Sequence, residues 1–155
     1  MLNISTDPDA EGRRRFIEDF GRYFAQWGLG ATLGRIWGYL LLSPEPASLD
    51  LIAADLGISK SNASTTCRQL EQFLLVRRSG QPGSRRALYE ANAMSRRFFD
   101  QILATYQELA RMLENGLPLS PDERVRARLD EAVDFFHAWL REFSQLVQRL
   151  EDSRR

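Results

Sequence analysis

Two short helical segments that meet at a glycine, followed by a short basic hairpin, constrain the fold of this 155-residue chain more than any other feature. Ser48 and Ser59 are suited to cap helices, and residues 49–56 and 60–74 carry apolar side chains at helical spacing. Gly57 ends the first segment, as glycine does in a left-handed C-terminal cap. The pattern therefore predicts two helices joined by a tight turn.

The apolar pattern no longer has a helical period after residue 74. Residues 75–79 and 87–91 are expected to form strands, and the segment GQPGS at residues 80–84 has the composition of a turn. Helix, glycine turn, helix and basic hairpin, in this order, are typical of a winged helix-turn-helix. We therefore predict a mainly α fold of the α+β winged-helix class, with the winged helix-turn-helix lobe at residues 31–92.

Two further helices are expected before the helix-turn-helix. Asp7-Pro8 has the composition of a helix start, and an apolar stripe runs from there to Trp27. Residues 31–42 are apolar nearly all round, which is typical of a buried helix. We expect the N-terminal segment, residues 1–30, to support dimerisation.

The final third of the chain is predicted to be helical. Asn92 is suited to cap a helix that runs to about Asn115, and Ser120-Pro121-Asp122-Glu123 has the pattern of a capping box for the last helix. Residues 93–155 are therefore expected to form a helical dimerisation region.

The last helix carries a nearly unbroken heptad stripe of apolar side chains, which is too apolar to remain in water. The stripe either packs against the preceding helix of its own chain or forms the interface of a homodimer, and we expect the homodimer. The predicted interface residues are Leu129, Val133, Phe136, Leu140, Phe143, Val147 and Leu150.

The charge of the chain is unevenly distributed although its 21 basic and 21 acidic residues cancel. Residues 57–92 hold six basic residues and two acidic residues, a net charge of +4, whereas the segments before and after this window are net negative. Such a window favours a polyanionic partner. The alternative is an ordinary solvated face on which charges cluster by chance.

The second helix of the helix-turn-helix is suited to the major groove of duplex DNA. Small hydroxyl side chains allow a helix to approach the groove closely, Asn62 can pair with adenine, and Arg68 can reach guanine or phosphate. Arginines on the hairpin can neutralise backbone phosphates or enter a minor groove. The predicted DNA-binding residues are Ser59, Lys60, Ser61, Asn62, Ser64, Thr65, Arg68, Arg77, Arg78, Arg85 and Arg86.

Six aromatic side chains are candidates for an effector pocket between the dimerisation helices and the DNA-binding lobe. An aromatic cage binds cationic or apolar ligands through cation–π contacts and burial. The alternative is that these residues are ordinary core. They are Tyr23, Trp27, Trp37, Tyr39, Phe98 and Phe99.

Two single residues leave alternatives open. Cys67 could act as a redox switch or pack as a small buried residue, and packing is favoured because the chain has no second cysteine to resolve an oxidised thiol. His137 lies beside the heptad stripe, where a structural or interfacial role is favoured over a pH sensor or a ligand-binding role.

Several function classes find no support. One histidine and one cysteine do not make a metal site of these residue types, and no phosphate-binding loop, nucleophile elbow or carboxylate pair stands out. We therefore expect no enzyme, and no catalytic residue, cofactor or metal. No apolar run is long enough to span a membrane and no secretory signal precedes the first helix, so we expect a cytoplasmic protein that does not contact membranes.

The sequence resembles the GbsR branch of the MarR-like transcriptional regulators. The resemblance rests on GRIWGYLLLSPEP at residues 34–46, on SLD at residues 48–50 and on LGISK at residues 56–60. PGSRRALYEA at residues 82–91 is similar to the wing of that branch. About residues 14–92 are covered, whereas the C-terminal helices are similar only in character.

This resemblance implies a homodimeric winged-helix repressor that a small molecule can tune. It places residues 59–65 and Arg68 in the recognition helix, and Arg85 and Arg86 in the wing. A dimer whose recognition helices lie about 34 Å apart reads a pseudo-palindromic operator. The alternative function is a winged-helix module that binds an acidic protein partner.

Overall fold

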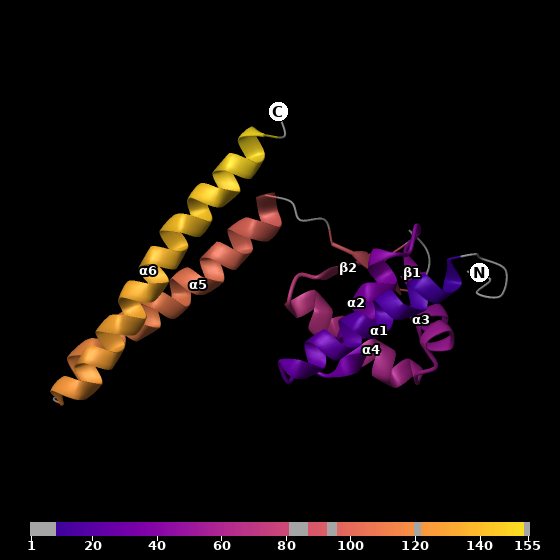
Figure 1. Cartoon of the computed structure of the whole chain (residues 1–155), viewed down its shortest axis with the longest axis horizontal. Coiled ribbons are helices and arrows are strands. Elements are labelled where there is room, and N and C mark those ends of the chain that lie inside the picture. The colour runs from indigo at the N-terminus through magenta and orange to yellow at the C-terminus, as the bar shows by residue number, and fades with distance from the viewer. Residues whose placement is uncertain (1–8, 81–86, 93–95, 120–121, 154–155) are drawn as a thin grey trace. The chain divides into compact units, whose positions relative to one another are not determined.

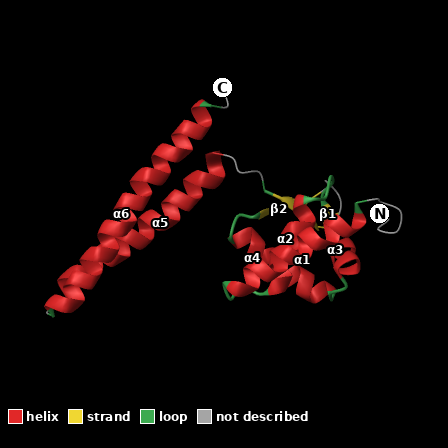
Figure 2. Cartoon of the chain, in the orientation of Figure 1, coloured by secondary structure: helices red, strands yellow, loops and turns green. Residues whose placement is uncertain are grey.

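The computed structural model describes residues 9–80, 87–92, 96–119 and 122–153, and divides into two compact units at residues 1–92 and 93–155 (Figure 1). Helices dominate both units, and the described strands all lie in the first (Figure 2). The predicted mainly α, winged-helix fold class is confirmed.

The first unit contains four helices and a small antiparallel sheet. The strands lie in the order β1-β3-β2, and residues Val76–Gly80 pair with residues Ala87–Ala91 as the wing hairpin. The elements are α1 (Ala10–Gln26), α2 (Ala31–Leu41), β1 (Ala47–Ser48), α3 (Leu49–Leu56), α4 (Lys60–Gln72), β2 (Val76–Gly80) and β3 (Ala87–Ala91).

Helices α1 and α2 cross in direct backbone contact. A Cβ atom at Gly34 would lie 2.1 Å from the carbonyl oxygen of Phe20, a distance at which no side chain fits. Arg35 also joins these helices to α3, because its Nε donates to Glu18 at 2.8 Å and its Nη2 donates to the carbonyl of Leu56 at 3.2 Å. Helix α1 is therefore an integral part of the first unit.

The core of the first unit lies between α1, α2, α3, α4 and the sheet. Ile36, Leu40, Ile52 and Leu70 are fully buried there. The hydroxyl of the buried Tyr39 donates to Oδ2 of Asp55 at 2.7 Å, which satisfies its polar end. Burial, reinforced by the hydrogen bond to Asp55 and its charge, raises the pKa of Tyr39 well above its ordinary value.

The second unit is a pair of packed helices, α5 (Arg96–Gly116) and α6 (Glu123–Asp152), joined through the short 3₁₀ helix η1 (Leu117–Leu119). Aromatic rings fill part of the contact: Tyr106 of α5 lies 4.5 Å from Trp139 and 6.0 Å from Phe136, centroid to centroid. Nε2 of His137 on α6 lies 2.7 Å from Oε1 of Glu114 on α5. His137 thus contacts the neighbouring helix, in line with a structural role.

Several helix ends differ from the sequence-based prediction. Helix α1 begins at Ala10, and the predicted start Asp7-Pro8 lies outside the described residues. Helix α4 ends at Gln72, because Leu74 adopts the left-handed conformation with φ of 60°. Helix α6 begins at Glu123, since Asp122 is its cap and accepts from the two amides that follow Glu123.

Asn92, which the sequence suggested as the cap of α5, belongs to the first unit, whereas α5 is described from Arg96 and residues 93–95 lie outside the described residues. The amide N–H of Asn92 donates to the carbonyl of Leu75 at 2.9 Å, and its Nδ2 donates to the carbonyl of Leu74 at 3.0 Å. The side chain thereby holds the turn between α4 and β2.

Strand β1 was not predicted, since two residues carry no local signal and only pairing with β3 defines them.

Candidate DNA-binding surface

The two serines beside the helix-turn-helix glycine are N-caps, as predicted. Oγ of Ser48 accepts from the amide of Leu51 at 3.2 Å, and Oγ of Ser59 accepts from the amide of Asn62 at 3.1 Å. Gly57 lies between them in the left-handed conformation, with φ of 64°. These local signals fix the position at which α4 begins and direct its N-terminal amides toward solvent, where they can meet a phosphate.

Helix α4 separates its side chains into a buried face and an exposed polar face. The buried face consists of Ala63, Thr66, Cys67 and Leu70. We call the opposite side the recognition face; its exposed residues are Ser61, Asn62, Thr65, Arg68, Gln69 and Gln72. Ser59 and Lys60 are exposed at its N-terminal end, whereas Ser64 is half-buried.

Gln69 and Gln72 were missed by the sequence-based prediction. They continue the recognition face at helical spacing, four residues after Thr65 and Arg68 respectively. Glutamine, like asparagine, offers a donor and an acceptor in one plane and can pair with adenine in the major groove. The helical period of the polar residues was the signal that could have found them.

Asn62 is held by its own helix. Its Oδ1 accepts a hydrogen bond from Oγ1 of Thr66, one turn along α4, at 3.2 Å. A carbonyl oxygen has two lone pairs, so Oδ1 can still accept from a base while Nδ2 remains available as a donor. The amide is therefore oriented before any DNA arrives.

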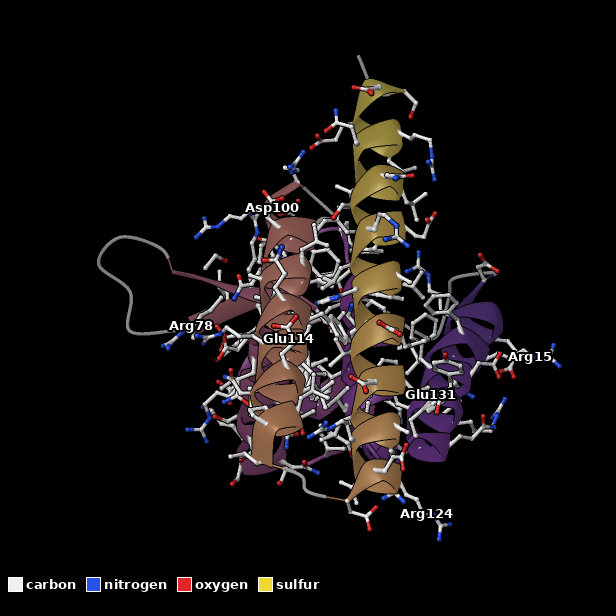
Figure 3. All side chains as sticks on the ribbon, turned by 90° about the vertical axis from the view of Figure 1, so that its left-hand side faces the viewer. Arg15, Arg78, Asp100, Glu114, Arg124 and Glu131 are labelled. Atoms are coloured by element: carbon white, nitrogen blue, oxygen red, sulfur yellow. The ribbon has the colours of Figure 1, made fainter. Side chains whose placement is uncertain are left out.

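The two arginines of β2 lie in different surroundings. Arg77 is opposite Glu90 in the wing hairpin, and its Nε lies 3.0 Å from Oε1 of that residue. Arg78 is opposite Tyr89, on the other face of the hairpin, and its side chain projects outward from the wing (Figure 3). Arg85 and Arg86, also predicted to contact DNA, lie outside the described residues.

Tyr89 lies on β3 opposite Arg78, and charges on both the wing and α4 act on its hydroxyl. Burial of its ring, followed by the charge of Glu71 on α4, raises the pKa of its hydroxyl. The positive charges of Arg78 and Arg68 act on the same hydroxyl in the opposite direction. Arginines from the wing and from the recognition face are therefore close enough to act on one group.

The described cations of the surface divide into paired and unpaired ones. Nζ of Lys60 lies 2.8 Å from Oδ1 of Asp50 on α3, and Arg77 is paired with Glu90. Within the described part of the chain, Arg68 and Arg78 have no ion-pair partner. These two arginines carry the positive charge that is free to meet a phosphate.

Cys67 lies on the buried face of α4 and is inaccessible to solvent. Burial, with a smaller contribution from the charge of Glu71, raises the pKa of its thiol to about 12. Because the thiolate is the reactive form, this environment favours packing over redox chemistry.

The predicted effector-pocket residues fall into both units. In the first unit Tyr39 is core, Trp37 packs against Phe20 and Phe24, and Tyr23 and Trp27 are exposed on the C-terminal part of α1 and its end. In the second unit Phe98 contacts Phe99, and Phe99 packs against Phe143 of α6. The pocket stays a prediction.

The predicted dimer stripe is partly used inside the chain. Val133 and Val147 are buried in the second unit, where α6 packs along α5, and Phe143 contacts Phe99 of α5. Phe136 and Leu140 are half-buried, as is Leu129, and Leu150 is exposed. Other large apolar side chains of the same two helices remain exposed: Leu109, Met112, Phe135 and Leu146.

The described residues contain neither a metal-binding cluster nor a membrane-spanning helix. No cluster of three or more histidine, cysteine or acidic side chains there is arranged to bind a metal ion. No described helix is both long and apolar enough to cross a bilayer.

Comparison with known proteins identifies the class. No family model matches the sequence. The HTH-type transcriptional regulator MmpR5 of Mycobacterium tuberculosis is 34% identical over 136 residues, which cover 84% of this chain and 80% of that protein. The chain belongs to the HTH-type transcriptional regulators.

Two further similarities agree with this assignment. The HTH-type transcriptional repressor OpcR of Bacillus subtilis is 22% identical, over 97% of this chain and 90% of that protein. The crystal structure of a transcriptional regulator superposes with a TM-score of 0.81 and 26% identity, over 91% of this chain and 99% of that one. This HTH-type regulator is thus a DNA-binding transcriptional regulator with a winged-helix fold, as the sequence had suggested.

Proposed function

We propose that this regulator binds a pseudo-palindromic operator as a homodimer and represses transcription from it. The recognition face of α4 reads base edges in the major groove, and the wing contacts the backbone beside it. The observation that carries the proposal is the recognition face itself, which presents six exposed polar side chains. The opposite, buried face is apolar apart from Thr66, whose hydroxyl donates to Asn62. The unpaired Arg68 and Arg78 supply the charge for phosphate contacts.

The individual side chains have distinct roles. Asn62, oriented by Thr66, pairs with adenine, and Gln69 lies about two turns beyond it on the same face. The capped N-terminus of α4 receives a phosphate through its free amides. Membership of the HTH-type regulators favours duplex DNA over an acidic protein as the partner.

The test begins with in vitro selection of bound duplexes, followed by affinity measurements on the selected site and on random duplex. Asn62→Ala is expected to lose about 1–3 kcal/mol of binding free energy on the selected site and much less on random DNA. Arg14→Ala, which removes a charge paired with Glu11 on α1, is the control and leaves both affinities unchanged. Equal losses for Asn62→Ala on both duplexes would contradict base readout.

The homodimer is supported by the apolar side chains that α5 and α6 leave exposed after packing on each other. Phe135 is 62% exposed and Met112 is 62% exposed, which is unusual for such large apolar groups without a partner. The faces that carry them adjoin the packed stripe, so two copies of the helix pair can form a larger bundle.

The dimer is tested by light scattering on two variants. Leu140→Glu places a charge in the predicted stripe, but Leu140 is half-buried and this change also threatens the α5–α6 packing. Phe135→Glu alters a side chain that the single chain leaves exposed, so it dissociates a dimer without unfolding the helix pair. A Phe135→Glu protein and a Leu140→Glu protein that both remain dimeric would overturn the proposed interface.

A further inference from the structure

Two carboxylates lie within the candidate DNA-binding surface, each in an ion pair with one of its cations. Asp50, in the first turn of α3, holds Lys60 at the start of α4 with an N–O distance of 2.8 Å. Glu90 of β3 holds Arg77 of β2 at 3.0 Å across the wing hairpin. The charges of Lys60 and Arg77 are therefore partly neutralised by the protein's own carboxylates.

We propose that Asp50 and Glu90 are specificity-determining residues that weaken binding to DNA of arbitrary sequence. The inference rests on the proposed function, since it concerns the same surface. In the free protein each carboxylate occupies the place that a phosphate oxygen would take beside its cation, and its negative charge repels an approaching phosphate. A duplex engages Lys60 or Arg77 only by displacing that carboxylate.

The two ion pairs lie on different elements and differ in exposure, so each tests the proposal independently. Side chains of Asp50 and Lys60 are both largely exposed, at 60% and 63%, and their ion pair is held only weakly against competition. The side chain of Glu90 is only 28% exposed and is fixed opposite Arg77 by the register of the hairpin. We therefore expect Asp50 to release its cation more readily than Glu90 does.

Non-specific and operator complexes differ in whether they require these ion pairs to be broken. A non-specific complex relies on phosphate attraction alone, and Arg68 and Arg78 are available for it without any exchange of partners. A complex on the operator brings the backbone into a fixed register in which displacement of both carboxylates is compensated by base contacts. The pairs thus increase the ratio of specific to non-specific affinity.

The experiment measures the affinity for a random-sequence duplex by fluorescence anisotropy at several salt concentrations, using the full chain. Asp50→Asn and Glu90→Gln are each expected to tighten binding about two- to five-fold at low salt. The slope of log affinity against log salt becomes steeper by about 0.9 for each cation that gains a phosphate. Thermal unfolding of each variant shows that the fold is retained.

Two controls separate this mechanism from simpler ones. Asp19→Asn makes the same change in net charge and breaks an exposed ion pair with Arg22 on α1, so it should leave DNA affinity unchanged. Asp50→Asn in a Lys60→Ala background should give much less tightening and no steeper salt dependence, because the cation that it releases is absent. Equal tightening by Asp19→Asn, or by Asp50→Asn without Lys60, would overturn the inference.

The outcomes also distinguish failure of the inference from failure of the proposed function. A wild-type protein with no affinity for any duplex at low salt would refute the proposed function. A wild-type protein that binds DNA with a clear salt dependence, while Asp50→Asn and Glu90→Gln bind no more tightly, would refute only the inference. Tightening is a sharp criterion, since a variant that merely damages the surface binds less tightly.

Discussion

Arg77 and Arg78 are adjacent cations on one strand, and the structure predicts that their removal has unequal effects on DNA binding. Arg77 is paired with Glu90, whereas Arg78 has no ion-pair partner in the described part of the chain and acts on the same hydroxyl as Arg68 of the recognition face. Arg78→Ala should therefore weaken binding to random duplex, and Arg77→Ala should weaken it much less.

The magnitude follows from the number of phosphate contacts. In the proposed dimer Arg78→Ala removes one contact per protomer, so the slope of log affinity against log salt falls by about 1.8. Between about 50 and 200 mM salt, the affinity of the wild-type protein then decreases about 12-fold more than that of the variant. For Arg77→Ala the slope should stay within about 0.5 of the wild-type value.

The assay is the same anisotropy titration repeated at four or more salt concentrations for the wild-type protein and both variants. The pair is internally matched, because both changes remove one arginine from β2 and alter net charge equally. Identical slopes for the two variants would show that the ion pair with Glu90 does not decide which arginine meets DNA. An unchanged slope for Arg78→Ala would remove the described wing from the interface.

Three further changes test other parts of the structure. Gly34→Ala places a methyl group 2.1 Å from the carbonyl oxygen of Phe20, and thermal unfolding should show a loss of about 2–4 kcal/mol of stability; a Tm equal to that of the wild type would contradict the close crossing. Asn92→Ala removes the hydrogen bond to the carbonyl of Leu74, so we expect about 1 kcal/mol less stability together with weaker DNA binding, whereas an unaltered denaturation midpoint would argue against the role of this side chain. Cys67, whose pKa is raised to about 12 by burial, should resist iodoacetamide at pH 8 in the native protein and react after denaturation; rapid native labelling would speak against its burial.

Local signals predicted the helix-turn-helix well because its boundaries are set by single residues. The caps Ser48 and Ser59 and the left-handed Gly57 act within one turn of the chain, and α3 has the bounds that the sequence suggested. The exposed polar side of α4 followed from the same helical period that identified its buried side, although Gln69 and Gln72 were overlooked.

Features that depend on distant parts of the chain could not be predicted in this way. Asn92 has the residue type of a helix cap, but its Nδ2 donates to the carbonyl of Leu74, and only the folded sheet brings that carbonyl within reach. The window at residues 57–92 was known to be basic, yet its pairing with Asp50 and Glu90 depends on helix packing and strand register. Among the described residues, counting charges therefore overestimated the number of cations without an ion-pair partner.

The close crossing at Gly34 also bears on how this regulator can be divided or recombined. Because no side chain separates the two backbones at Gly34, α1 packs directly on α2 and covers apolar side chains of that helix, such as Trp37, which packs against Phe20 and Phe24. A chimera that takes only the helix-turn-helix and wing would expose these side chains to water. A DNA-binding domain transferred from this chain must therefore begin at α1, even though that helix carries none of the residues proposed to contact DNA.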